Sequence, residues 1–135
     1  MRTQTISFTL GPTLWMSANH SGRVNTHWAV TRRKTMNLRR LAAMQARAQR
    51  LRPPRGRVRV TAWVQYPTRG RADPNNAAPT TKALIDGLTD AGIWPDDDHT
   101  HVIGPDHRRA NGTCPRGLHI ITLTIEEEAK EGAES

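Results

Sequence analysis

The chain has 135 residues, the size of one ordinary domain, and its 36% apolar and 24% charged residues allow a modest core and exclude a disordered chain. The formal net charge is +8. No long apolar run occurs, so we expect no membrane span, and the single cysteine excludes an internal disulfide and a cysteine-rich zinc site. We therefore expect a single soluble domain covering residues 1–135, in a reducing compartment such as the cytoplasm.

Residues 5–10 form the first predicted strand, because polar and apolar residues alternate there. Residues 11–25 are rich in Gly, Pro, Ser and Asn and predict a long loop, which is a candidate ligand-contacting segment. A basic helix is expected from about Trp28 until the pair Pro53–Pro54 stops it. Spacings of three and four residues predict that its buried stripe consists of Leu38, Leu41, Met44, Ala48 and Leu51.

The clearest predicted strand spans residues 57–66, where the alternation is regular. Trp63 falls on the polar side of this strand, which indicates that the second face of the sheet is partly covered, as it would be for a central strand. Residues 67–78 are rich in Pro, Gly, Arg and Asn and predict a loop.

A second helix is predicted to begin near Pro79 and to end before Gly92, which suits a left-handed C-cap. Val102 and Ile103 predict a short strand and residues 121–125 the last one, and residues 127–135 are expected to form a frayed tail. The predicted fold class is α/β (α+β), a mixed β-sheet with two packed helices in the order β-α-β-α-β-β.

Basic and acidic residues are distributed unevenly along the sequence, and the change comes after residue 72. Residues 1–72 hold fifteen Lys and Arg and no Asp or Glu, whereas residues 73–135 hold five basic residues and all twelve acidic ones, so the two parts carry +15 and 5 − 12 = −7. The absence of acids favours a polyanionic partner, above all nucleic acid, over a solubilising surface. The side chains expected to contact phosphates are Arg32, Arg33, Arg39, Arg40, Arg47, Arg69 and Arg71.

Oxygen-bearing side chains and one lysine recur through a loop, a helix start and a turn that can converge at one end of the sheet. They are Asp73, Asn75, Asn76, Lys82, Asp86, Asp96, Asp97 and Asp98. Scattered carboxylates without His or Cys suit Mg²⁺ better than zinc, and Mg²⁺ supports phosphodiester cleavage. By pattern alone, a solvated turn with a surface Lys82–Asp86 pair is the simpler interpretation.

Three stretches in this region have a specific order. They are Asp-Pro-Asn-Asn at 73–76, Lys-Ala-Leu-Ile-Asp-Gly-Leu at 82–88 and Asp-Ala-Gly-Ile-Trp-Pro-Asp-Asp at 90–97. Together they resemble the signature of the RusA family of Holliday junction resolvases, over about residues 69–102. The resemblance implies a RusA-like fold and a homodimeric, Mg²⁺-dependent endonuclease of bacterial or phage origin. Such an enzyme binds four-way DNA junctions and nicks them in pairs during recombination and repair.

By position, the resemblance places Asp73 and Asp97 at the catalytic, metal-binding aspartates and Lys82 at the catalytic lysine, which also meets the DNA. Asn75 stands where the family has a second aspartate, and three extra residues precede Lys82. Because an amide brings no negative charge, Asp86 and Asp98 are expected to assist Asn75 as further metal ligands.

Two alternatives stay open from the sequence. The substitution at Asn75 is compatible with a protein that binds branched DNA without cutting it. A basic RNA-binding or ribosome-associated protein would need no carboxylate site at all.

The aromatic and histidine side chains have plain interpretations. For Trp15 the sequence leaves two interpretations open, packing within the protein and stacking on nucleobases. Core or interface packing is expected for Trp28, Trp63 and Trp94. Ordinary polar loop positions are expected for His99, His101 and His107, because their spacing matches no zinc pattern.

Overall fold

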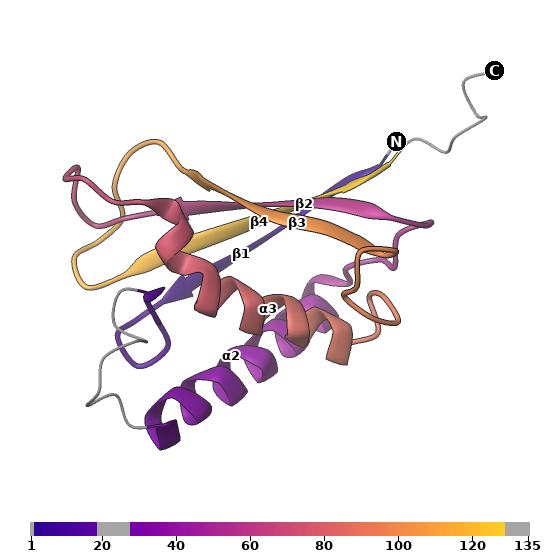
Figure 1. The fold of residues 1–135 in the computed structure, drawn as a ribbon, viewed down its shortest axis with the longest axis horizontal. Helices are drawn as coiled ribbons and strands as arrows, with labels where there is room; N and C mark the ends of the chain where they lie inside the picture. The colour runs from indigo at the N-terminus through magenta and orange to yellow at the C-terminus, as the bar shows by residue number, and fades with distance from the viewer. Residues whose placement is uncertain (1, 19–27, 129–135) are drawn as a thin grey trace.

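The structure is a computed structural model that describes residues 2–18 and 28–128. Its elements are β1 (Thr3–Leu10), α2 (Trp28–Gln49), β2 (Val58–Gln65), the 3₁₀ turn η1 (Pro74–Ala77), α3 (Ala78–Asp90), β3 (Val102–Arg109) and β4 (His119–Glu127). A four-stranded mixed sheet lies above the two helices, which cover one of its faces (Figure 1). The predicted mixture of a sheet with two packed helices is confirmed.

The sheet has the strand order β1-β4-β2-β3. β4 pairs antiparallel with both β1 and β2, whereas β2 pairs parallel with β3. Parallel neighbours need a crossover connection, and α3 supplies it. The loop after β2 therefore leads into the start of α3, and the turn after α3 leads into the start of β3 (Figure 1).

The core lies between the sheet and the helices. Successive side chains of a strand point to opposite faces of the sheet. Alternate residues of β1, β2 and β4 are therefore buried on one face, and they include Phe8, Val60 and Leu123. α2 buries Leu38, Ala42, Ala43 and Ala46.

The predicted buried stripe of α2 is wrong at two positions. Met44 is 67% exposed and Ala48 is exposed, while Ala42 and Ala46 are buried. The reason is the close approach of α3: a Cβ at Gly87 would collide with the Arg39 carbonyl and with the Ala42 Cβ. Small residues are needed at this crossing, so the buried row follows the alanines and not the largest side chains.

The second face of the sheet is less covered than Trp63 suggested. Trp63 is 39% exposed and Trp28 is 74% exposed, so neither lies in the core, and packing of these two side chains at an interface between chains stays a prediction. Trp94 is buried as predicted, and its indole Nε1 donates to Thr89 Oγ1 at 2.8 Å.

β3 is much longer than the predicted pair Val102–Ile103 and reaches Arg109. Its polar composition and Pro105 hid it, but β3 is an edge strand, where proline and alternate exposure are tolerated. Gly104 has φ +104°, and a Cβ there would lie 2.5 Å from the Val60 carbonyl oxygen, so the close approach to β2 requires glycine.

The ends of the other elements follow the prediction closely, with two corrections. α2 ends at Gln49, before the predicted stop at Pro53–Pro54, and Arg50 after it has φ +57°. Gly92 has φ +80° and ends α3 in the predicted left-handed conformation. β4 continues through Glu127, and the Glu128 amide donates to the Arg57 carbonyl at 3.0 Å, so the frayed tail was predicted to begin too early. Residues 129–135 lie outside the described residues, and so do residues 19–27, which include residues 19–25 of the predicted long loop. None of the helices in the described ranges has the length and apolarity to cross a membrane.

Candidate active site

Lys82 is the centre of an ion-paired cluster on the exposed side of α3. Its Nζ donates to Asp86 Oδ1 at 3.0 Å and to Asp97 Oδ2 at 2.8 Å. The two carboxylates are about three-quarters covered, with side-chain exposures of 25% and 23%, while Lys82 is 66% exposed. We call these three residues the Lys82 cluster.

Local structure explains why these residues meet. Lys82 and Asp86 are four residues apart on α3, so they share a face, and the opposite face buries Leu84 and Leu88. After Gly92 the chain folds back, because Ile93 and Trp94 are buried in the core. This turn brings Asp97 to Lys82, fifteen residues away in sequence.

The three side chains of the Lys82 cluster shift one another's pKa values. The hydrogen bond from Lys82 lowers the pKa of Asp97, and the bonds to Asp97 and Asp86 raise the pKa of Lys82. Burial raises the pKa of Asp86, against the lowering effect of Lys82, and the neighbouring Asp97 raises it further. Two carboxylates facing one ammonium leave negative charge that a further cation would neutralise.

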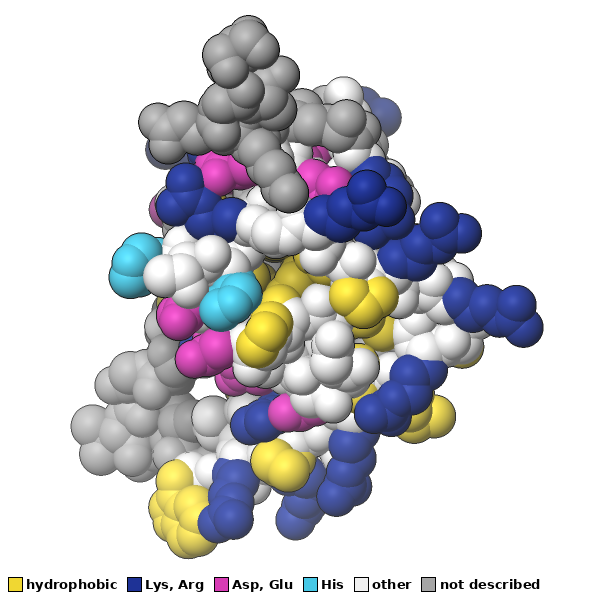
Figure 2. Space-filling view, turned by 90° about the vertical axis from the view of Figure 1, so that its right-hand side faces the viewer, with side chains coloured by type: hydrophobic (Ala, Val, Ile, Leu, Met, Phe, Trp, Pro, Cys, Tyr) yellow, Lys and Arg dark blue, Asp and Glu magenta, His cyan; other side chains and the backbone are white. Residues whose placement is uncertain are grey.

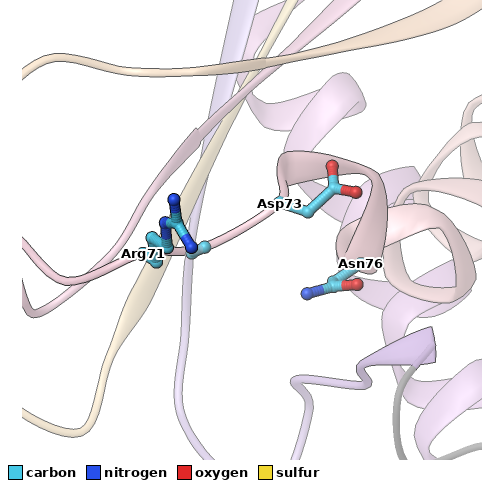
Figure 3. A pocket seen from close by; sticks show the side chains of 4 residues that line it. Arg71, Asp73 and Asn76 are labelled. Carbon is cyan, nitrogen blue, oxygen red and sulfur yellow. The ribbon is translucent and has the colours of Figure 1, made fainter.

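Asp73 lies at the start of η1 and is not part of the Lys82 cluster. It is exposed and caps η1, where its Oδ1 accepts the Asn75 backbone N–H at 3.0 Å. With Arg71, Ala72 and Asn76 it lines an open hollow of about 520 Å³, which we call the Asp73 hollow. Figure 3 shows Asp73 and Asn76 on the same turn, with Arg71 on the segment that leads into it. Asn75 is exposed and does not line this hollow.

His107 lies on β3 and contacts α3 next to Lys82, and is not the ordinary loop residue that the sequence predicted. Its Nε2 lies 2.8 Å from the hydroxyl of Thr81, which precedes Lys82 on α3. Burial lowers the pKa of His107, and the carboxylates of Asp106 and Asp73 oppose that effect. His107 was expected in a loop because β3 was predicted too short, although Pro105, His107 and Arg109 alternate with more exposed residues.

The predicted metal ligands are not all brought together. Within the described chain, no hydrogen bond or ion pair joins Asp73 to the Lys82 cluster, and no group of three or more His, Cys, Asp or Glu forms a metal site. Asp98 Oδ1 is engaged elsewhere, 2.6 Å from Thr100 Oγ1 and 2.7 Å from His101 Nδ1. Asp86 and Asp97 by themselves fit Mg²⁺, which takes one or two carboxylates and keeps several waters.

The arginines predicted to bind phosphates differ in whether a described carboxylate pairs with them. Arg39 forms a two-bond ion pair with Asp90, at 2.9 and 2.8 Å, so its charge is compensated. The other arginines predicted to bind phosphates are exposed and form no ion pair with a described residue: Arg32, Arg33, Arg40, Arg47, Arg69 and Arg71. In Figure 2, Lys and Arg side chains line the right-hand side and the lower edge of the face, with a further group at the upper left, whereas the His side chains and several acidic ones lie on the left.

Comparison of the chain with protein-family models and with curated proteins found no match.

Proposed function

We propose that this protein is a RusA-like, Mg²⁺-dependent endonuclease that binds four-way DNA junctions as a homodimer and resolves them by paired nicks. The observation that supports this most is the Lys82 cluster. The resemblance pairs Lys82 with Asp97 as catalytic residues, and in the fold their side chains lie 2.8 Å apart although they come from a helix and a distant turn.

Each residue has a chemical role in this proposal. Asp97 and Asp86 would hold Mg²⁺, with Asp73 on the adjoining turn near His107. A bound Mg²⁺ supplies charge stabilisation and a more acidic water for phosphodiester hydrolysis. Lys82 neutralises the charge that accumulates on the phosphoryl oxygens. The exposed arginines hold the DNA backbone, so recognition depends on the shape of the junction more than on its bases.

The homodimer follows from the symmetry of the reaction. Two equivalent nicks in a two-fold junction require two equivalent sites, which a two-fold pair of chains supplies. Each chain would contribute one Lys82 cluster and one set of exposed arginines.

The test is nicking of a synthetic four-way junction with Mg²⁺ by the wild type and by Asp97→Asn, with Asp98→Asn as the matched control. Asp97→Asn removes a charge from the Lys82 cluster and should slow nicking by roughly 100-fold or more, the scale of losing one charge-stabilising group. Asp98→Asn changes the neighbouring carboxylate, which is bonded to Thr100 and His101, and should keep near wild-type activity. Equal rates for the two variants would contradict the assignment of Asp97.

A second candidate function is a branched-DNA-binding protein that does not cut. The observation in its favour is that no ion pair joins Asp73 to the Lys82 cluster among the described residues, and that the neutral Asn75 stands two residues after Asp73. Tight junction binding without nicking, in the wild type and in Asn75→Asp, would establish this candidate and refute the nuclease. Preference for RNA, with indifference to Asp97→Asn, would refute both.

A further inference from the structure

A second hollow lies beside the loop that carries Asp73. Arg69, Arg109, Ala110, Asn111 and Gly112 line it, with a volume of about 390 Å³ and no acidic side chain among the lining residues. We call it the Arg109 hollow. We propose that it binds a backbone phosphate of the DNA strand whose neighbouring segment enters the Asp73 hollow. This inference rests on the DNA-binding part of the proposed function and not on cleavage.

Arg109 is held in place by two backbone carbonyls and an aromatic ring. Its Nη1 donates to the Gly70 carbonyl at 2.6 Å and its Nη2 to the Thr68 carbonyl at 2.7 Å. The guanidinium carbon lies 5.0 Å from the centre of the Tyr66 ring, a cation–π distance. These partners are neutral, and Arg109 forms no ion pair with any described carboxylate. The guanidinium therefore remains a positioned cation with N–H groups to spare.

The rest of the rim is also held in place. Gln65 Nε2 donates to the Asn111 carbonyl at 3.0 Å, and the Ala110 amide donates to the Val64 carbonyl at 2.9 Å. Arg69 is exposed and forms no ion pair with a described residue. A hollow with two arginines and a fixed backbone favours an anion with several oxygens, because guanidinium groups bind phosphate with paired hydrogen bonds.

The position of this hollow favours a phosphate within a nucleic-acid strand. Arg69 lines the Arg109 hollow, whereas Arg71, two residues later, lines the Asp73 hollow. Arg109 holds the middle of the connecting loop, and the Tyr66 hydroxyl donates to the Asp73 carbonyl at 3.2 Å. A strand that crosses this loop would thus meet two basic positions of fixed relative placement.

The test is a double-mutant cycle between protein and DNA, measured by junction binding in Ca²⁺ to suppress cleavage. Single phosphates near the crossover are replaced in turn by uncharged methylphosphonates. For the wild type, one position should weaken binding by roughly tenfold, the scale of one charged contact. For Arg69→Ala the same substitution should have almost no further effect, and the log–log salt slope should fall by about one unit.

Arg108→Ala is the matched control, because Arg108 neighbours Arg109 on β3, is exposed and is absent from the hollow. It removes an equal charge and should leave the effect of the methylphosphonate intact. Arg109→Gln removes the charge with a side chain that still donates hydrogen bonds, and should behave like Arg69→Ala. Arg109→Lys keeps the charge, so the methylphosphonate should still weaken its binding. Thermal unfolding verifies that these variants are folded.

Three outcomes decide the matter. The strand-phosphate site is supported if one methylphosphonate loses its effect in Arg69→Ala but keeps it in Arg108→Ala. This result supports the site even if the wild type does not nick the junction, and in that case only the nuclease proposal fails. Absence of coupling at every phosphate overturns the inference. The inference is also overturned if inorganic phosphate raises the thermal unfolding temperature while no methylphosphonate position depends on Arg69. That result would indicate a site for a free oxyanion.

Discussion

At the residue scale, the stacking of Trp15 on His119 links packing to pH. The two ring centroids are 3.8 Å apart and the planes differ by 2°, and Tyr66 meets both rings edge-on. One face of Trp15 is thus occupied by a protein side chain. Burial lowers the pKa of His119, and its Nδ1 is buried without a hydrogen-bond partner among the described residues. The neutral ring is therefore the form that the fold accepts.

The sign of the pH effect follows from this shift. The unfolded state takes up a proton near the ordinary pKa of 6.5, whereas the folded state resists protonation until a lower pH. Stability should therefore fall as the pH decreases from 6.5 through the folded-state pKa. His119→Phe keeps an aromatic ring on Trp15 without a titrating group, so its melting temperature should decline less over that range. Parallel pH curves for the two proteins would contradict the assignment.

At the element scale, the crossing of α2 and α3 depends on small residues. Gly87 meets the Arg39 carbonyl and the Ala42 side chain, and Leu38 is fully buried beside this contact. α3 also carries part of the candidate site, because Lys82 and Asp86 lie four residues apart on this helix.

The buried row of α2 can be tested by two truncations. Leu38→Ala should lower the free energy of unfolding by about 2–5 kcal/mol, the usual cost of a cavity in a packed core. Met44→Ala removes a side chain that is 67% exposed and should change stability by less than about 0.5 kcal/mol. Chemical denaturation of both variants gives the comparison, and equal losses would restore the row predicted from sequence.

At the scale of the whole molecule, the basic and acidic halves of the sequence interleave. Arg2 pairs with Glu127 at 3.1 Å, and Arg57 pairs with Glu128 at 2.6 Å. Arg39 pairs with Asp90 across the two helices. The sharp division of charge along the chain therefore becomes a surface on which some arginines are paired with carboxylates and others form no ion pair with a described residue.

This difference between neighbouring arginines predicts their effect on DNA binding. Arg40→Ala should weaken junction binding and reduce its salt dependence, because Arg40 is exposed without a carboxylate partner among the described residues. Arg39→Ala should change junction affinity less, since it removes a compensated charge. Titrations at several salt concentrations measure both effects. A salt-independent affinity for the wild type would contradict the basic surface itself.

The parts of the fold that were predictable depend on local periodicity and local caps. The strands with regular alternation were located, and so was α3 with its Gly92 terminus. β3 was mostly missed because polar residues and Pro105 erase the apolar signal in an edge strand. As a consequence, His107 was assigned to a loop, whereas it lies on β3 with its Nε2 2.8 Å from the Thr81 hydroxyl.

The sequence by itself determined the class of the fold and the residue types available for chemistry, because these depend on composition and on short-range order along the chain. Only the tertiary structure decided which charges meet: Lys82 with Asp86 and Asp97, Arg39 with Asp90, and Arg109 with neutral carbonyls. Side-chain contacts between distant segments depend on how the helices cross the sheet and where the turns fold back. That packing comes from the whole core, and no single segment of the sequence contains it.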